Sequence, residues 1–137
     1  MSDKIIILVI DDEIISRYTI EALLESNDCT LVFAENGKQG IEKAETMTPD
    51  LILLDVMMPD MNGFQVCRLL RADLRFKDVP IVMVTGWDDP IARSRCLSIG
   101  ATDIICKPFN RKDLRAIISK LLKGNAKVAV PCQSEPT

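Results

Sequence analysis

The sequence contains no histidine, and its five cysteines include no Cys-x-x-Cys pair. The lack of histidine removes the commonest metal ligand and the commonest general base, so any metal or proton chemistry must depend on other side chains. An odd number of cysteines without the spacing of a metal site is typical of reduced thiols in a cytosolic protein. We therefore expect neither a zinc site nor a disulfide framework.

Long apolar runs and a strong charge bias are also missing. No run approaches the roughly 20 apolar residues that a membrane-spanning helix needs, and the first residues, 1–4, lack the features of a signal peptide. A net charge of −3 provides no electrostatic argument for direct nucleic-acid binding. With 137 residues, 47% hydrophobic and 27% charged, the chain is predicted to be one globular domain with a cytoplasmic location.

Four apolar runs, each followed by a polar residue, predict the strands of a parallel sheet. They cover Ile5–Ile10, Leu51–Leu54, Pro80–Val84 and Asp103–Cys106, and a shorter run at 30–34 predicts an edge strand. Segments with helical spacing, caps or helix-ending glycines lie between and after them, at about 13–26, 37–47, 63–72, 90–99 and 111–123. Strands that alternate with helices of this length predict a doubly wound α/β fold with helices on both faces.

The first predicted helix has an apolar stripe at helical spacing. The stripe consists of Ile15, Tyr18, Ala22 and Leu23. This spacing places the four side chains on one face of the helix.

Polar residues at the strand ends predict the chemistry. In order, the four runs end in an acid pair, a single acid, a hydroxyl and an ammonium: Asp11 and Asp12, Asp55, Thr85, and Lys107. Open α/β sheets bind ligands at the carboxyl ends of their strands. Carboxylates that converge there repel one another unless a cation joins them, and Mg²⁺ prefers oxygen ligands beside phosphate. An aspartate can act as a nucleophile that forms an acyl phosphate, while a hydroxyl and a lysine can bind phosphoryl oxygens.

These motifs, taken in order, resemble the receiver domain of two-component response regulators over residues 4–123. The resemblance rests on four motifs: Asp11-Asp12, the run Leu-Leu-Asp-Val-Met-Met-Pro around Asp55 with Gly63 after it, Thr85-Gly86, and Lys107-Pro108. It implies a flavodoxin-like (βα)5 fold with a five-stranded parallel sheet in the order 2-1-3-4-5. Residues 124–137, which are small and polar with two prolines, are expected to form a C-terminal tail or a truncated linker.

The resemblance also implies roles for single residues. Asp55 would be the phosphoacceptor, and Mg²⁺ would be held by Asp11, Asp12, Asp55 and the backbone carbonyl of Met57. Of the neighbouring acids, Glu13 is expected to be a first-turn helix acid, Asp60 to be solvated, and Asp50 to lie at the opposite end of the sheet.

Further roles concern the phosphoryl group and the switch. Thr85, Gly86 and Lys107 would bind the phosphoryl group, and the bond before Pro108 is expected to be cis. Met57 and Trp87 lie where family members tune the lifetime of the phosphoryl group. Ile104 occupies a switch position that is usually aromatic, and an aliphatic side chain there puts the usual coupling with Thr85 in doubt.

The partners implied are a sensor histidine kinase or a phosphotransfer protein as phosphoryl donor, because a chain without histidine cannot be its own phosphohistidine donor. An output domain or partner protein, and a phosphorylation-dependent dimer through the fourth helix, fifth strand and fifth helix, are also implied. The chain would not be an enzyme apart from catalysing its own phosphoryl uptake and hydrolysis.

Two alternatives remain open at this point. One is a Mg²⁺-dependent phosphatase with an aspartyl nucleophile, which would need a DxD pattern after the first strand and a cap for its substrate. The other is a degenerate receiver that serves only as a docking module.

Overall fold

The structure is a computed structural model, and it describes residues 4–24, 29–86, 90–125 and 127. Strands and helices alternate along this part of the chain. The elements are β1 (Ile5–Ile10), α1 (Ile14–Leu24), β2 (Cys29–Ala34), α2 (Gly37–Met47), β3 (Leu51–Asp55), α3 (Gly63–Arg71), a 3-10 helix η1 (Leu74–Phe76), β4 (Ile81–Thr85), α4 (Pro90–Ser98), β5 (Asp103–Cys106) and α5 (Arg111–Leu121). In the described ranges, no helix has the length and apolar character needed to cross a membrane.

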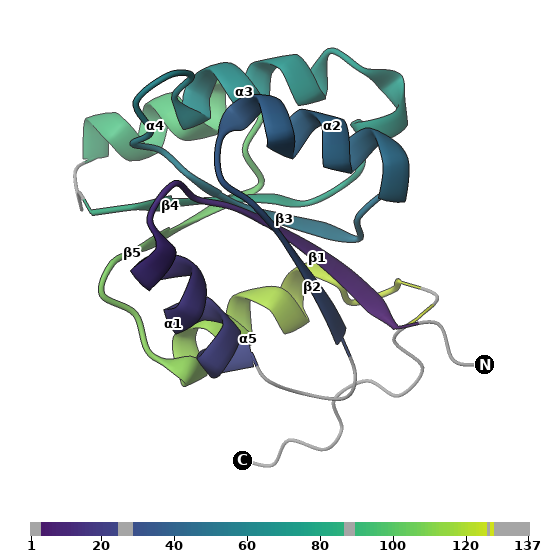
Figure 1. The fold of residues 1–137 in the computed structure, drawn as a ribbon, viewed down its shortest axis with the longest axis vertical. Helices are drawn as coiled ribbons and strands as arrows, with labels where there is room; N and C mark the ends of the chain where they lie inside the picture. The colour runs from purple at the N-terminus through teal and green to yellow at the C-terminus, as the bar shows by residue number, and fades with distance from the viewer. Residues whose placement is uncertain (1–3, 25–28, 87–89, 126, 128–137) are drawn as a thin grey trace.

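The five strands form one parallel sheet in the order β2-β1-β3-β4-β5. Helices α1 and α5 cover one face of this sheet, and α2, α3 and α4 cover the other (Figure 1). This arrangement confirms the predicted doubly wound fold and its strand order. The order reverses between β1 and β3, and such a switch point is where open α/β sheets bind ligands.

The central strand β3 shows why the sequence has apolar runs instead of alternating residues. All of its residues are buried. Leu51 and Leu53 pack in the apolar layer that includes α1 and α5 residues, while Ile52 and Leu54 pack in the layer that includes α2, α3 and α4 residues. A strand covered on both faces needs apolar side chains at every position.

Helix starts follow the local caps that the sequence contains. Asn36, Asn62 and Asn110 each accept a hydrogen bond from the backbone three residues later, and Asn62 forms a reciprocal capping box with Gln65. The short helix η1 was not predicted from the sequence. It begins after Asp73, whose side chain accepts a hydrogen bond from the Arg75 N–H group. These caps satisfy backbone N–H groups that have no partner inside the helix.

The apolar stripe of α1 that the sequence contains is not the buried side of this helix. Ile15 is 70% exposed and Tyr18 is 60% exposed, whereas the buried residues of this helix are Ile20 and Leu24. The helix is apolar on more than one side, and the position of α1 on the sheet, with the Arg17 guanidinium donating to the Asp11 carbonyl at 2.7 Å, selects the buried side. Spacing alone could not distinguish these stripes.

Candidate metal and phosphoryl site

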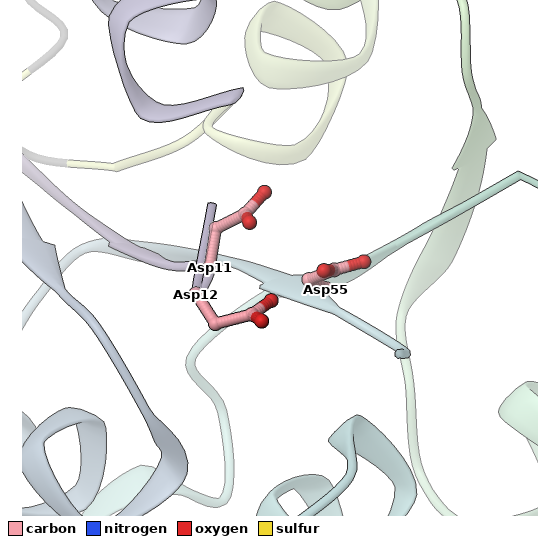
Figure 2. A group of neighbouring side chains, drawn as sticks. All are labelled: Asp11, Asp12 and Asp55. Atoms are coloured by element: carbon pink, nitrogen blue, oxygen red, sulfur yellow. The ribbon is translucent and has the colours of Figure 1, made fainter. Parts of the chain in front are cut away.

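Strand register places the predicted acids next to each other. Ile10 of β1 pairs with Leu54 of β3, so the next residues, Asp11 and Asp55, lie side by side at the carboxyl end of the sheet. Carboxylate oxygens of Asp11, Asp12 and Asp55 all lie within 4.8 Å of one another, and Figure 2 shows the three side chains around one space between the ends of β1 and β3. The structure therefore brings together the three acids that the sequence analysis selected.

Two of these acids are buried, and burial changes their titration. Asp55 is 5% exposed and Asp11 is 2% exposed. Burial and the neighbouring Asp11 raise the pKa of Asp55 to about 7, although Lys107 and the Met57 N–H group oppose the increase. Burial also raises the pKa of Asp11, against the hydrogen bond from the Glu13 N–H group and the charge of Lys107. Both carboxylates therefore lack sufficient positive charge around them.

The donor set fits a hard divalent cation. It consists only of carboxylate oxygens, it is partly buried, and its charges are undercompensated. Such oxygen ligands suit Mg²⁺ or Ca²⁺, and Mg²⁺ is usually held by few carboxylates together with phosphate oxygens.

The hydroxyl lies at the end of β4, and the ammonium belongs to the residue directly after β5. Thr85 ends β4 and is 3% exposed, and the Lys107 N–H group donates to its carbonyl at 2.7 Å. The Lys107 Nζ atom lies 3.7 Å from Asp11 Oδ2 and 3.9 Å from Asp55 Oδ1. The Lys107–Pro108 peptide bond is cis, the isomer that the family resemblance implies.

Gly63, which follows Asp55 in the same motif, supports the site through its lack of a side chain. A Cβ atom built on Gly63 would lie 2.4 Å from the Asp55 carbonyl oxygen and 2.8 Å from the Val56 Cα atom. Only glycine therefore allows the start of α3 to approach the backbone of Asp55 this closely. The available signal was a glycine eight residues after the acid, immediately after the Asn62 cap.

The remaining predicted residues differ in their surroundings. The Met57 side chain is 55% exposed, while Ile104 is 5% exposed and packs in the apolar layer with α2, α3 and α4 residues. Gly86 is exposed, and a Cβ atom built on it would contact nothing within 4 Å. Trp87 lies outside the described residues.

Two of the other acids lie as predicted, and Glu13 lies one residue earlier than expected. Glu13 is exposed and precedes α1 instead of lying in its first turn, and its carbonyl accepts from the Arg17 N–H group at 3.1 Å. Asp60 is exposed in the loop after β3, and Asp50 precedes β3 at the opposite end of the sheet.

A doubly wound parallel sheet whose carboxyl end holds three carboxylates, a hydroxyl and a lysine defines a class of α/β domains that bind their ligands at that end. Comparison with known families identifies the class further. The model of the response regulator receiver domain family matches residues 7–119, and the chain belongs to this family.

Individual relatives agree with this assignment. A probable transcriptional regulator, ycf27, of Cyanophora paradoxa is 39% identical over 85% of this chain and 48% of its own length. The chemotaxis protein CheY4 of Vibrio cholerae superposes with a TM-score of 0.83 at 29% identity, over 88% of this chain and 100% of that chain. The receiver domain of the sensor histidine kinase PA1611 of Pseudomonas aeruginosa, solved with a magnesium ion in its active site cleft, gives a TM-score of 0.80 at 30% identity, over 88% and 98%.

The chain spans about half the length of the curated relatives that it matches. Receiver domains of response regulators act in two-component signalling, where they take phosphoryl groups from histidine kinases.

Proposed function

We propose that this chain accepts a phosphoryl group on Asp55 with Mg²⁺ bound, and that the phosphorylated form changes its contacts with an output partner. The observation that carries the proposal is the buried Asp55 carboxylate, which lies within 4.8 Å of the oxygens of Asp11 and Asp12 and 3.9 Å from the Lys107 ammonium. The carbonyl of Met57, next to the end of β3, would complete the protein ligands of the cation.

The chemistry follows from these groups. A carboxylate oxygen of Asp55 attacks phosphorus in a phosphohistidine of the donor, the P–N bond breaks, and a P–O bond forms an acyl phosphate. The Thr85 hydroxyl and the Lys107 ammonium each donate to a phosphoryl oxygen. When bound, Mg²⁺ neutralises charge on the phosphoryl oxygens and on the acids.

We assign residues 4–123 to the receiver domain and residues 124–137 to a linker or tail. The curated relatives are about twice as long as this chain, and the first of them is a probable transcriptional regulator. This supports an output domain or a partner protein that acts on transcription, with the receiver providing control and not the contacts to DNA.

The face formed by α4, β5 and α5 is our candidate for the output surface. Thr85 and Lys107, which contact the phosphoryl group in this proposal, lie at the ends of the strands that precede α4 and α5. Helix α4 has a single buried residue, Cys96, while Ile91 is 78% exposed. A helix with so few buried contacts moves at low cost, and its exposed apolar side chain supports a partner or a second copy on this face.

The decisive experiment is phosphorylation with acetyl phosphate and Mg²⁺, followed by intact mass measurement. The wild type should gain one phosphoryl group, and Asp55→Asn should gain none. Asp60→Asn is the matched control, because it makes the same change at an exposed aspartate in the adjacent loop, and it should label like the wild type. Labelling of Asp55→Asn to the wild-type extent would show that the acceptor is a different residue.

The same assay separates the alternatives. A phosphatase would release phosphate from added phosphomonoesters continuously, without first needing an acyl phosphate donor. A degenerate docking module would not gain mass at all.

A further inference from the structure

A hydroxyl on the first turn of α1 lies closer to the Lys107 ammonium than any carboxylate of the site does. The Lys107 Nζ atom donates to Ser16 Oγ at 3.2 Å. Its distances to Asp11 Oδ2 and Asp55 Oδ1 are 3.7 Å and 3.9 Å, which exceed hydrogen-bond length. The shortest side-chain contact that the structure gives this ammonium is therefore to a neutral group.

Ser16 is itself held in place by a neighbour. Its hydroxyl donates to Glu13 Oε1 at 3.3 Å. A serine hydroxyl has one proton and two lone pairs, so donation to Glu13 leaves its oxygen directed to accept from Lys107. The contact joins positions 91 residues apart, one on α1 and the other at the end of β5.

Lysine needs such a contact if it is to be placed accurately. Its side chain has four flexible carbons and loses rotamer freedom when it is ordered, and the Lys107 side chain is 30% exposed. An ammonium has three N–H donors. One of them directed to Ser16 leaves two that can face the acids, or the phosphoryl oxygens that form on Asp55.

We propose that Ser16 is a positioning residue that holds the Lys107 ammonium in place for the phosphoryl group. The proposal rests on the proposed function, in which Lys107 donates to a phosphoryl oxygen. Without the hydroxyl, Lys107 samples more rotamers, and the bound phosphoryl group has to order it.

The first test observes the resting protein without metal or phosphate. In ¹⁵N–¹H spectra at low temperature, Lys107 ammonium protons should exchange slowly in the wild type and become broadened or invisible in Ser16→Ala. Thr19→Ala is the matched control: it removes a hydroxyl from the same helix, and that hydroxyl is exposed and donates to the Ile15 carbonyl. Its Lys107 signal should match the wild type. An unchanged signal in Ser16→Ala would overturn the proposal.

The second test measures the dissociation constant of beryllofluoride, a phosphoryl mimic, at saturating Mg²⁺. Loss of one long hydrogen bond, such as that of 3.2 Å between Lys107 and Ser16, changes an equilibrium by about three- to tenfold, so Ser16→Ala should bind that much more weakly, while Ser16→Thr and Thr19→Ala should bind like the wild type. Alanine favours helix more than serine does, so weaker binding by a folded Ser16→Ala would not come from loss of α1. If Ser16→Ala does not fold, Ser16→Cys keeps the size and provides only a weak acceptor.

The outcomes distinguish this inference from the proposed function. If the wild type takes up phosphate on Asp55 and Ser16→Ala binds beryllofluoride equally well, the role of Ser16 is wrong and the function stands. If the wild type does not bind beryllofluoride or label at all, the proposed function itself is wrong.

Discussion

The two ends of the central sheet each pair an aspartate with a lysine, and they do so in opposite ways. At the amino end, Asp50 Oδ2 accepts from the Lys127 ammonium at 2.9 Å and from the Ile6 N–H group at 2.8 Å. At the carboxyl end, the Lys107 ammonium stays 3.9 Å from Asp55 Oδ1. Both carboxylates are shielded from solvent, with side chains 13% exposed for Asp50 and 7% exposed for Asp55.

The aspartate at the amino end makes a structural contact, whereas the aspartate at the carboxyl end belongs to the candidate binding site. Asp50 has its partners within the chain, including the Asn125 amide, which donates to Oδ1 at 3.3 Å. Asp55 instead faces two further acids, and its pKa is raised to about 7 mainly because it is buried without full compensation. The incomplete charge compensation of this buried carboxylate lowers the stability of the folded state, and a cation that binds there would restore it.

The largest expected effect is that an aspartate-to-asparagine substitution changes the free energy of unfolding in opposite directions at the two ends of the sheet. Without metal at pH 8, Asp55→Asn should raise the free energy of unfolding by on the order of 4 kcal/mol, because the pKa of Asp55 is raised from 3.8 to about 7 and each unit of pKa shift corresponds to about 1.4 kcal/mol. Asp50→Asn should lower it by about 1–3 kcal/mol, because it weakens a charged hydrogen-bond acceptor. Urea unfolding in EDTA measures both, and equal signs for the two variants would contradict the comparison.

The gain from Asp55→Asn should depend on pH. The folded-state pKa of Asp55 is raised from 3.8 to about 7, so between these values the folded state binds more protons than the unfolded state. Stability from this group is then fully present below about pH 4 and is lost as pH rises through about 7. Unfolding curves in EDTA from pH 4 to pH 8 should show the advantage of Asp55→Asn growing with pH. A stability difference that does not change with pH would mean that the pKa of Asp55 is not raised in the folded state.

Magnesium should offset the destabilisation caused by the acids at the carboxyl end of the sheet. The increase in the free energy of unfolding should depend on the Mg²⁺ concentration. A ligand that binds only the folded state at 100 times its dissociation constant stabilises by about 2.7 kcal/mol. Thermal unfolding should therefore show a higher Tm with Mg²⁺ for the wild type and no shift for Asp12→Ala, which should also be more stable than the wild type without metal. The control Asp60→Ala should shift like the wild type. Equal shifts for Asp12→Ala and the wild type would rule out this metal site.

A smaller effect is expected from the lysine of the amino end. Lys127→Met should lower the free energy of unfolding by about 1 kcal/mol, since it removes one charged hydrogen bond while retaining most of the aliphatic stem. Phosphoryl uptake from acetyl phosphate should not change, because Lys127 contacts Asp50 at the opposite end of the sheet. A large loss of uptake would show that the two ends are coupled.

The smallest expected effect is the rearrangement that carries the signal. Beryllofluoride should shift the amide NMR signals of the non-proline residues in 86–91 and of Ile104. These shifts should be larger than those of the parts of α1 and α2 that lie away from the site. We expect the change to be modest, because Ile104 is a buried aliphatic residue of the apolar core and has no ring to rotate. Shifts confined to the surroundings of Asp55, with α4 unchanged, would mean that the face of α4, β5 and α5 is not the output surface.

Much of this protein follows from local sequence. Apolar runs such as Leu51–Leu54 predict buried strands because both faces of the sheet are covered. Caps such as Asn36 and Asn110 predict helix starts because their side chains bond backbone groups three residues away. The three acids of the site could be predicted because parallel strands bring their carboxyl ends to one edge of the sheet. Asp55 at the end of one strand is therefore expected near Asp11 and Asp12 at the end of another.

Other features were decided only by the tertiary structure, because they depend on contacts between segments that are distant in sequence. The buried side of α1 contains Ile20 and Leu24, whereas Tyr18 is exposed. The position of the helix on the sheet selects which of its apolar residues are buried. The contact of Ser16 with Lys107 spans 91 residues, and that of Asp50 with Lys127 spans 77. Sequence order brings polar groups to one end of the sheet, but only the packing of the helices against it determines which ammonium contacts which oxygen.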